Sequence, residues 1–250
     1  MQRAPFPFLA GLVLAVAMAT PAGAGWLAAT ATVATDYRFR GVSQSDGHPV
    51  AQLTLEADLG GDLAAGAFVS PVDFDDGSTS FETDLYLMKG FSIGRTDLSL
   101  AAIYYAYPDH RLRAGESRYS AAEITLDASR SWGPATAHAS LAWSPAYTSG
   151  KGEELYASAG LSLRLAREVV ADANAGYQWT ARIDRFTPAS SGYEHWDAGL
   201  RADWNPFAAD LRIFGTSLSG PACAATQGDA RWCGTTVVLS VSYDLASLAR

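Results

Sequence analysis

The sequence has little cysteine and little positive charge, and it lacks long hydrophobic runs beyond its first 24 residues. Its 250 residues include 2 cysteines, and 18 Lys and Arg stand against 26 Asp and Glu, which gives a net charge of −8. This acidic balance argues against nucleic-acid binding, which needs a basic stripe. No later apolar run reaches about 18 residues, so no transmembrane helix is predicted there. Strands that cross a membrane alternate apolar with polar residues and therefore leave no such run.

Motifs of common enzyme classes are also missing. The sequence contains no H-E-x-x-H, G-x-S-x-G, P-loop or G-x-G-x-x-G. Four histidines (48, 110, 138 and 195) are scattered along the chain. His195, with Asp197 two residues later, is the best candidate for a general base, and a hydrogen-bonding role is the plainer interpretation. We therefore expect no catalytic residues, no enzyme activity and no cofactor.

One acidic segment has some of the spacing of a calcium loop. Its oxygen donors are Asp73, Asp75, Thr79 and Asp84, with a glycine at Gly77. However, Ser78 stands where the sharp-turn glycine belongs, and the last donor is an aspartate rather than a glutamate. The favoured interpretation is an acidic surface loop without a metal. Weak divalent-ion bridging to lipopolysaccharide phosphates is the alternative.

The first 24 residues have the features of a cleaved Sec signal peptide. The apolar run 8–19 is too short to span a bilayer, and Ala22-Gly23-Ala24 has the small-x-small pattern of a cleavage site. A buried N-terminal helix is the alternative, although the run has no polar face. We predict a signal peptide at 1–24, one domain at 25–250, and export from the cytoplasm.

The two cysteines fit an exported protein. Cys223 and Cys233 lie ten residues apart in a loop rich in Gly, Pro and Ala. In an oxidising compartment such a pair favours a disulfide, with two free thiols as the alternative. A metal site is not expected at these cysteines, because no second Cys or His pair accompanies them.

Alternation of apolar and polar residues recurs throughout the domain. In 153–165, for example, Leu155 and Leu161 share a face, while Tyr156 and Arg164 lie on the other. Such period-two patterns indicate strands. Twelve segments have the pattern: 28–40, 49–59, 62–72, 80–92, 96–107, 117–130, 135–145, 153–165, 168–179, 192–204, 208–218 and 233–245.

Loop lengths and aromatic positions point to a membrane barrel. Longer polar loops follow the odd-numbered segments and short turns follow the even-numbered ones, as in outer-membrane barrels. Trp and Tyr gather at the strand ends, as expected at a membrane interface, although aromatics also cap soluble cores. The predicted fold is an all-β, antiparallel up-and-down transmembrane β-barrel of about 12 strands.

A barrel also explains the segment T-D-Y-R-F-R-G at 35–41. Tyr37 and Phe39 are expected to face lipid, while Arg38 and Arg40 face the lumen or its mouth. The residues predicted to line the lumen are Arg38, Arg40, Glu56, Asp58, Glu82, Asp84, Glu123, Asp127, Arg164, Asp172, His195, Asp197, Arg201 and Asp203.

Three stretches resemble the TorF family of proteobacterial porins. They are TDYRFRGVSQSDGHPVAQ at 35–52, SPVDFDDGSTSFETDLY at 70–86 and YYAYPD at 104–109. The resemblance implies an outer-membrane barrel but carries over no substrate and no binding residues. The chain departs from the pattern at its end, because Tyr243 is followed by D-L-A-S-L-A-R rather than closing the sequence.

Three functions remain open from the sequence. The first is a passive channel for small polar solutes or ions in the bacterial outer membrane. The second is a non-conducting structural or sensing barrel with a salt-bridged lumen. The third is a soluble periplasmic β-protein. The expected partners are outer-membrane lipid, lipopolysaccharide, the barrel-assembly machinery and small solutes, with no nucleic acid; neither the solute nor the oligomeric state follows from the residues.

Overall fold

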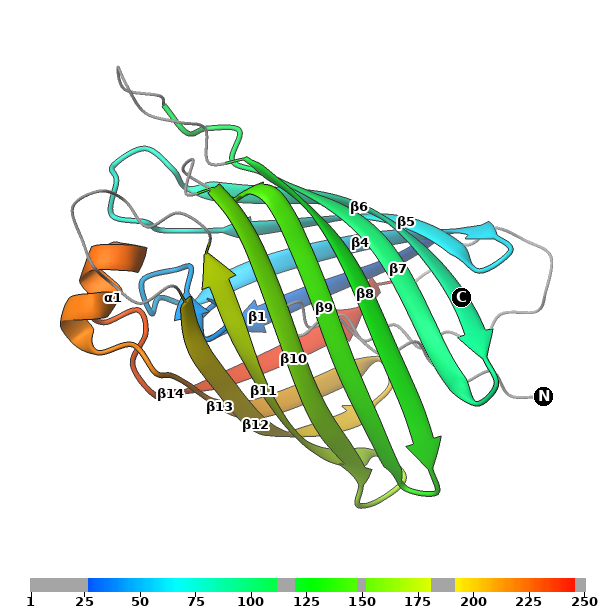
Figure 1. Ribbon diagram of the computed structural model, residues 1–250. Helices are drawn as coiled ribbons and strands as arrows, with labels where there is room; N and C mark the ends of the chain where they lie inside the picture. Colours follow the sequence, from blue (N-terminus) through cyan, green and yellow to red (C-terminus); the bar gives the residue numbers. More distant parts are fainter. Residues whose placement is uncertain (1–26, 112–119, 148–151, 181–191, 246–250) are drawn as a thin grey trace.

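The protein is a closed antiparallel β-barrel (Figure 1). The computed structural model describes residues 27–111, 120–147, 152–180 and 192–245. The barrel strands are β1 (Leu27–Ala34), β4 (Val50–Gly60), β5 (Leu63–Pro71), β6 (Phe81–Ile93), β7 (Thr96–Ala106), β8 (Ala121–Trp132), β9 (Ala135–Tyr147), β10 (Gly152–Arg164), β11 (Val169–Thr180), β12 (Gly192–Trp204), β13 (Phe207–Thr216) and β14 (Thr236–Asp244). Each pairs with its neighbour in the chain, and β1 pairs with β14 to close the sheet. The predicted twelve-stranded barrel is confirmed.

The alternation of side chains decides which face of each strand is enclosed. On β8, Glu123, Thr125 and Asp127 point inward and are buried, while Ile124 and Leu126 are 49% and 41% exposed. Leucines, tryptophans and other large apolar residues are exposed in the same way around the whole wall. An apolar outer face around a polar interior is the arrangement of a barrel that contacts lipid. It is the reverse of the apolar core that a soluble β-protein requires.

The two ends of the barrel differ. At one end the strands are joined by short turns at 61–62, 94–95, 133–134, 165–168 and 205–206. Gly61, Gly94 and Gly133 have positive φ in these turns, a conformation that glycine adopts without strain. The longer connections lie at the opposite end, where Figure 1 shows α1 (Gly220–Gln227) beside the barrel mouth.

The segment between β1 and β4 folds into the barrel. Ala34 is paired directly with Val50, so the two strands are adjacent and residues 35–49 are not needed to close the wall. These residues, here called the inward segment, include the small hairpin β2 (Arg38–Phe39) and β3 (Val42–Ser43). Its side chains contact inward-facing residues of β5, β7, β8, β10 and β11. Contact with so many wall strands places the segment inside the lumen.

The prediction that Tyr37 and Phe39 face lipid is therefore wrong. Strand β1 ends at Ala34, and Tyr37 is 5% exposed, with its ring 5.8 Å from that of Phe68 on β5. Phe39 is partly buried, and its ring centroid lies 5.9 Å from that of Tyr105 on β7. Both rings pack against the inner wall because the chain has turned inward before reaching them.

One short helix accompanies the strands of the predicted all-β fold. Helix α1 begins where the Ser219 side chain accepts a hydrogen bond from the Ala222 amide, with proline in its first turn. Its 8 residues are too few for a periodic pattern to stand out. Within the described residues, no helix has the length and apolarity to cross a membrane.

Replacing the outward-facing Leu161 with arginine tests which face meets lipid. Leu161 on β10 is 54% exposed, and a charge there costs about 2 kcal/mol or more if the side chain sits in hydrocarbon. Urea unfolding in lipid vesicles measures how far Leu161→Arg lowers the free energy of unfolding.

Ser162→Arg is the matched control, since Ser162 points inward opposite Asp172. We expect a much smaller loss for it, because the new guanidinium can pair with that carboxylate. Equal losses for the two variants would contradict the assigned faces.

Candidate functional site: the inward segment and the lumen

A tight turn places the tip of the inward segment at the lumen wall. Arg40 and Gly41 join β2 to β3 with φ of 48° and 83°, the positive values that two-residue hairpin turns require. A Cβ on Gly41 would lie 2.7 Å from Thr216 Cγ2 and 3.0 Å from His195 Cβ. Glycine is thus needed both for the turn and for the close approach to β12 and β13.

Arg40 joins the tip to three strands of the opposite wall. Its Nη2 lies 2.7 Å from Glu123 Oε2, and its Nη1 donates to Gln178 Oε1 at 2.9 Å. The guanidinium also lies 4.1 Å from the centroid of the Tyr156 ring. Both members of the Arg40–Glu123 ion pair are at least 95% buried, and Glu123 also accepts from Tyr105 Oη at 3.1 Å. The planar guanidinium can serve a carboxylate, an amide and a ring at once.

Asp36 organises the base of the inward segment. Its carboxylate accepts from Arg38 Nε at 2.5 Å, from Ser43 Oγ at 2.6 Å and from Ser45 Oγ at 3.0 Å. Ser45 Oγ in turn accepts from the backbone N–H of Tyr37 at 3.0 Å. These contacts fold the two ends of the segment onto each other, so the hairpin enters the barrel as one unit.

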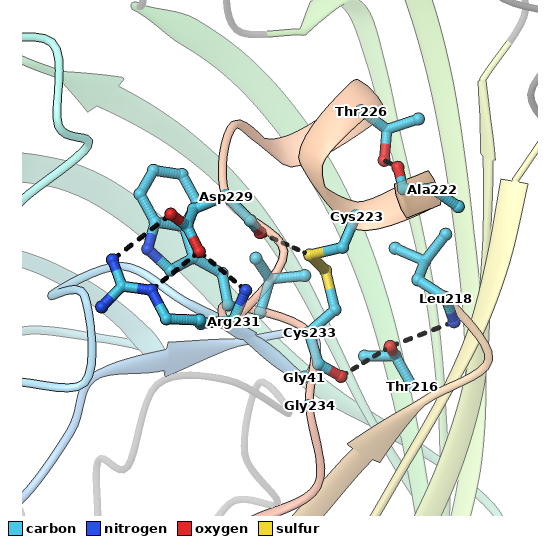
Figure 2. Close-up of a disulfide and its surroundings, with 12 residues drawn as sticks. Gly41, Thr216, Leu218, Ala222, Cys223, Thr226, Asp229, Arg231, Cys233 and Gly234 are labelled. Carbon is cyan, nitrogen blue, oxygen red and sulfur yellow. Dashed lines mark hydrogen bonds and ion pairs between the residues drawn. A yellow bond between two sulfur atoms is a disulfide. The ribbon is translucent and has the colours of Figure 1, made fainter. Parts of the chain in front are cut away.

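The loop that carries the two cysteines holds this base from outside. The structure joins Cys223 to Cys233 by a disulfide, with a Cα–Cα distance of 5.9 Å (Figure 2). The backbone carbonyl of Trp232 accepts from Arg38 Nη1 at 2.6 Å and from the Ser43 amide at 2.9 Å. The neighbouring carbonyl of Cys233 accepts from Thr216 Oγ1 at 2.9 Å, as Figure 2 shows. The disulfide therefore sits between β13 and the inward segment.

Tyr37 carries a neutral hydroxyl into a part of the lumen that is rich in carboxyl groups. Its burial, followed by the nearby carboxylates of Glu82 and Asp84, raises the pKa of Tyr37 well above its ordinary value. Tyr37 therefore stays protonated at physiological pH. Glu82 and Asp84 are themselves 3% and 1% exposed.

A second charged cluster lies on the β11–β13 side of the lumen. Arg212 Nη1 lies 2.7 Å from Asp172 Oδ2, Arg212 also pairs with Asp197, and its Nε lies 3.2 Å from Asp210 Oδ1. Three carboxylates thus share one guanidinium. Asp172 and Asp197, both predicted to line the lumen, belong to this cluster, and Asp197 is engaged by Arg212 rather than by His195.

His195 makes a different contact from the one a general base would need. Its Nε2 lies 2.8 Å from Tyr156 Oη, and the two rings stack with centroids 5.5 Å apart. Because Arg212 engages Asp197, this geometry favours the hydrogen-bonding role for His195 in the wall.

Four predicted lumen residues lie at the short-turn rim instead of deep inside. Asp58 accepts from the Gly60 amide, and the exposed Arg164 donates to the Arg167 carbonyl. Arg201 and Asp203 form a rim ion pair of 2.7 Å. Strand ends project beyond the enclosed part of the barrel, which explains why these side chains meet solvent.

The lumen is narrow at the level of the Arg40 tip. A cavity of about 30 Å³ lies beside it, lined by Arg40, Asp84, Tyr105, Glu123 and Tyr156 among others. That volume is room for about one water. The tip contacts wall residues of β8, β10, β11, β12 and β13, so the inward segment reaches across the lumen at this level. Glu56 lies on the same inner wall and accepts from Tyr86 Oη at 3.0 Å, while Asp127 is 4% exposed on β8.

The comparison with protein families is decisive for membership. Residues 18–243 match the model of the Gcw_chp family, described as a bacterial protein of unknown function. The chain belongs to the Gcw_chp family. The match does not name the TorF family, so that resemblance stays a prediction. No curated protein sequence matches the chain.

Solved porins share the fold of this Gcw_chp protein. The NanC porin in a rhombohedral crystal form aligns with a TM-score of 0.57 and 5% identity, over 88% of this chain and 98% of that one. The KdgM porin aligns with a TM-score of 0.54 and 7% identity, over 87% and 98% of the two chains. A further KdgM structure, in complex with disordered oligogalacturonate, gives the same values. At these identities the likeness shows the fold alone.

Several residues of the site carry no strong sequence signal. Asp36 bonds residues close to it in sequence, but it falls within the strand predicted at 28–40, where the alternation gives no sign of the turn that brings them together. Trp232 lies in a connection, and its partner Arg38 is 194 residues away. Gly41 after an Arg-aromatic-Arg run is the one local sign that the chain turns at this point.

Removing the charge of Arg40 leaves Glu123 buried without its ion pair. We expect Arg40→Met to lower the free energy of unfolding by about 3–5 kcal/mol, the cost of breaking a buried pair from one side. Urea unfolding in lipid vesicles provides the measurement.

The double variant Arg40→Met/Glu123→Gln should recover much of that loss, because the remaining side chain is uncharged. No recovery in the double variant would show that the ion pair is not what anchors the tip.

Proposed function

We propose that this protein is a porin-like channel of the bacterial outer membrane that passes small polar or cationic solutes, and that its inward segment narrows the passage. The observation that carries the proposal is an acid-rich polar interior enclosed by an apolar outer wall. Strands β1 and β4 pair directly, with Ala34 opposite Val50, so the inward segment is an addition within the lumen. The porin fold and the bacterial family support the same assignment.

The location follows from the outer surface of the barrel. An apolar wall of this kind is stable in a bilayer, and closed barrels of this architecture occur in outer membranes. The predicted signal peptide at 1–24, which lies outside the described residues, supplies the export step. Outer-membrane lipid, lipopolysaccharide and the barrel-assembly machinery are the partners that such a location requires.

The carboxyl groups of the lumen favour cations over anions. Glu82, Asp84 and Asp127 line the inner wall, and the described residues show no ion pair to an arginine for any of the three. Carboxyl groups along a passage offer oxygen ligands to cations and no positive partner to anions. We therefore propose cations or neutral polar molecules as solutes, carried passively and without catalysis.

A second candidate is a non-conducting barrel. The ion pairs inside the lumen favour it: Arg40 pairs with Glu123, and Arg212 binds a cluster of three aspartates. In that case the inward segment and the ion pairs together form a permanent plug. The two candidates differ in whether ions cross when the inward segment is removed.

Planar-bilayer recordings separate them. The test variant replaces residues 36–48 with a short Gly-Ser linker, which suffices because Ala34 and Val50 are already neighbours. We expect small or rare currents for the wild type and larger stepwise currents for the variant, with a reversal potential in a KCl gradient that shows cation preference. Removing the segment lets water replace Arg40 at Glu123, so the wall should still fold.

Heat-modifiable migration on gels serves as the folding control for this variant. A folded variant that stays silent in several salts would overturn the channel proposal and leave the non-conducting barrel.

A further inference from the structure

A histidine and two aspartates from separate connections meet at the long-loop end of the barrel. Asp46 and His48 belong to the inward segment, and Asp73 belongs to the connection from β5 to β6. One ligand atom from each of these three side chains lies within 4.8 Å of the other two. Asp46 is partly exposed, and His48 and Asp73 are exposed, so an ion in solution can reach them.

Backbone contacts fix the two connections against each other. The Asp73 amide donates to the Gln44 carbonyl at 2.8 Å, and Ser45 forms a β-bridge with Asp73. The His48 amide donates to the Ser45 carbonyl at 2.9 Å, which closes the turn that carries Asp46. The three donor side chains are therefore attached to backbone whose relative position is set by hydrogen bonds.

Outer contacts orient both carboxylates. Asp46 Oδ1 accepts from Trp232 Nε1 at 2.8 Å, and Asp73 Oδ1 accepts from the Asp75 amide at 3.0 Å. Hydrogen bonds of this kind orient metal ligands and raise their affinity for the ion. Arg231 also pairs with Asp46, but its side chain is 69% exposed and it pairs with Asp229 as well, so it can turn away from Asp46.

We propose that Asp46, His48 and Asp73 bind a first-row divalent cation such as Zn²⁺, which clamps the inward segment to the wall loop. One imidazole nitrogen with two carboxylate oxygens suits Zn²⁺ better than Ca²⁺ or Mg²⁺, which prefer oxygen ligands alone. Ligand atoms around a tetrahedral Zn²⁺ lie roughly 3.3 Å apart, so small side-chain rotations close the observed spacing. Water completes the coordination at this exposed site.

This site differs from the calcium-like pattern at 73–84. Asp84 lies inside the barrel on β6, away from the loop, so the five residues of that pattern do not assemble. Asp76 is occupied within its own loop: although partial burial opposes it, hydrogen bonds from Thr79 and Ser78 lower the pKa of Asp76 to about 2. Only Asp73 of the pattern contributes to the proposed site, together with residues from a connection about 25 positions earlier.

Calorimetric titration of the refolded full chain with Zn²⁺ tests the proposal. We expect saturable one-to-one binding to the wild type and at least about tenfold weaker binding to His48→Ala and to Asp73→Asn. Asp75→Asn is the matched control, because Asp75 is an exposed carboxylate of the same loop that lies outside the cluster, and it should bind like the wild type. Excess Ca²⁺ should not displace Zn²⁺.

Hydrogen exchange with and without Zn²⁺ tests the clamp itself. Slower exchange in residues 42–50 and 72–76 of the wild type, but not of His48→Ala, supports it. The proposal is overturned if the wild type shows no saturable binding, if His48→Ala binds equally well, or if Asp75→Asn weakens binding as much as Asp73→Asn. It is also overturned if Zn²⁺ binds while exchange in both segments stays unchanged. Each readout is independent of whether the barrel conducts.

Discussion

The structure depends on the need to bond every backbone N–H and C=O group where lipid offers no partner. A sheet meets that need only by closing on itself, which it does here through the pairing of β1 with β14. Closure then dictates the chemistry of each strand, because successive side chains must face hydrocarbon and lumen in turn. The outward Ile124 and Leu126 beside the inward Glu123 and Asp127 follow from this one geometric rule. The lumen is thereby the one enclosed place where the chain can hold charged groups.

Enclosing charges creates a second requirement, since buried ions need partners. The inward segment brings Arg40 to Glu123, and the wall supplies Arg212 to Asp172, Asp197 and Asp210. These two arginines hold the interior in different ways. Arg212 pairs residues that the strands already place near one another, whereas Arg40 ties a separate piece of chain to three strands. The position of that piece is supported at its base by Asp36 and, through the Trp232 carbonyl, by the loop closed with the Cys223–Cys233 disulfide.

The strands were predictable because the period-two signal is repeated over long segments with short, glycine-containing turns between them. The predicted ends of most strands fall within a few residues of those observed, including β6, β11 and β12. The failure at 35–40 has a physical reason. Residues 38–39 do form a strand, so the alternation continues across the point where the chain leaves the wall. Whether residues 35–40 continue along the wall or turn into the lumen depends on contacts with Phe68, Glu123 and Trp232, which are remote in sequence. The Asp46–His48–Asp73 cluster could not be predicted from the sequence for the same reason, since its residues come from two separate connections.

The barrel wall does not need the inward segment, which indicates that the segment has a role other than closing the sheet. Ala34 and Val50 are neighbours across a strand pair, so a two-residue turn would join β1 to β4 as it joins β6 to β7. Burying Arg40, Arg38 and Asp36 in place of such a turn carries a desolvation cost that the wall itself does not require. A segment that adds cost without closing the sheet is best explained by its effect on the lumen. Because its tip is held by Arg40 and its base by the loop that carries the disulfide, changes at the barrel mouth can reach the level of Arg40 in the interior.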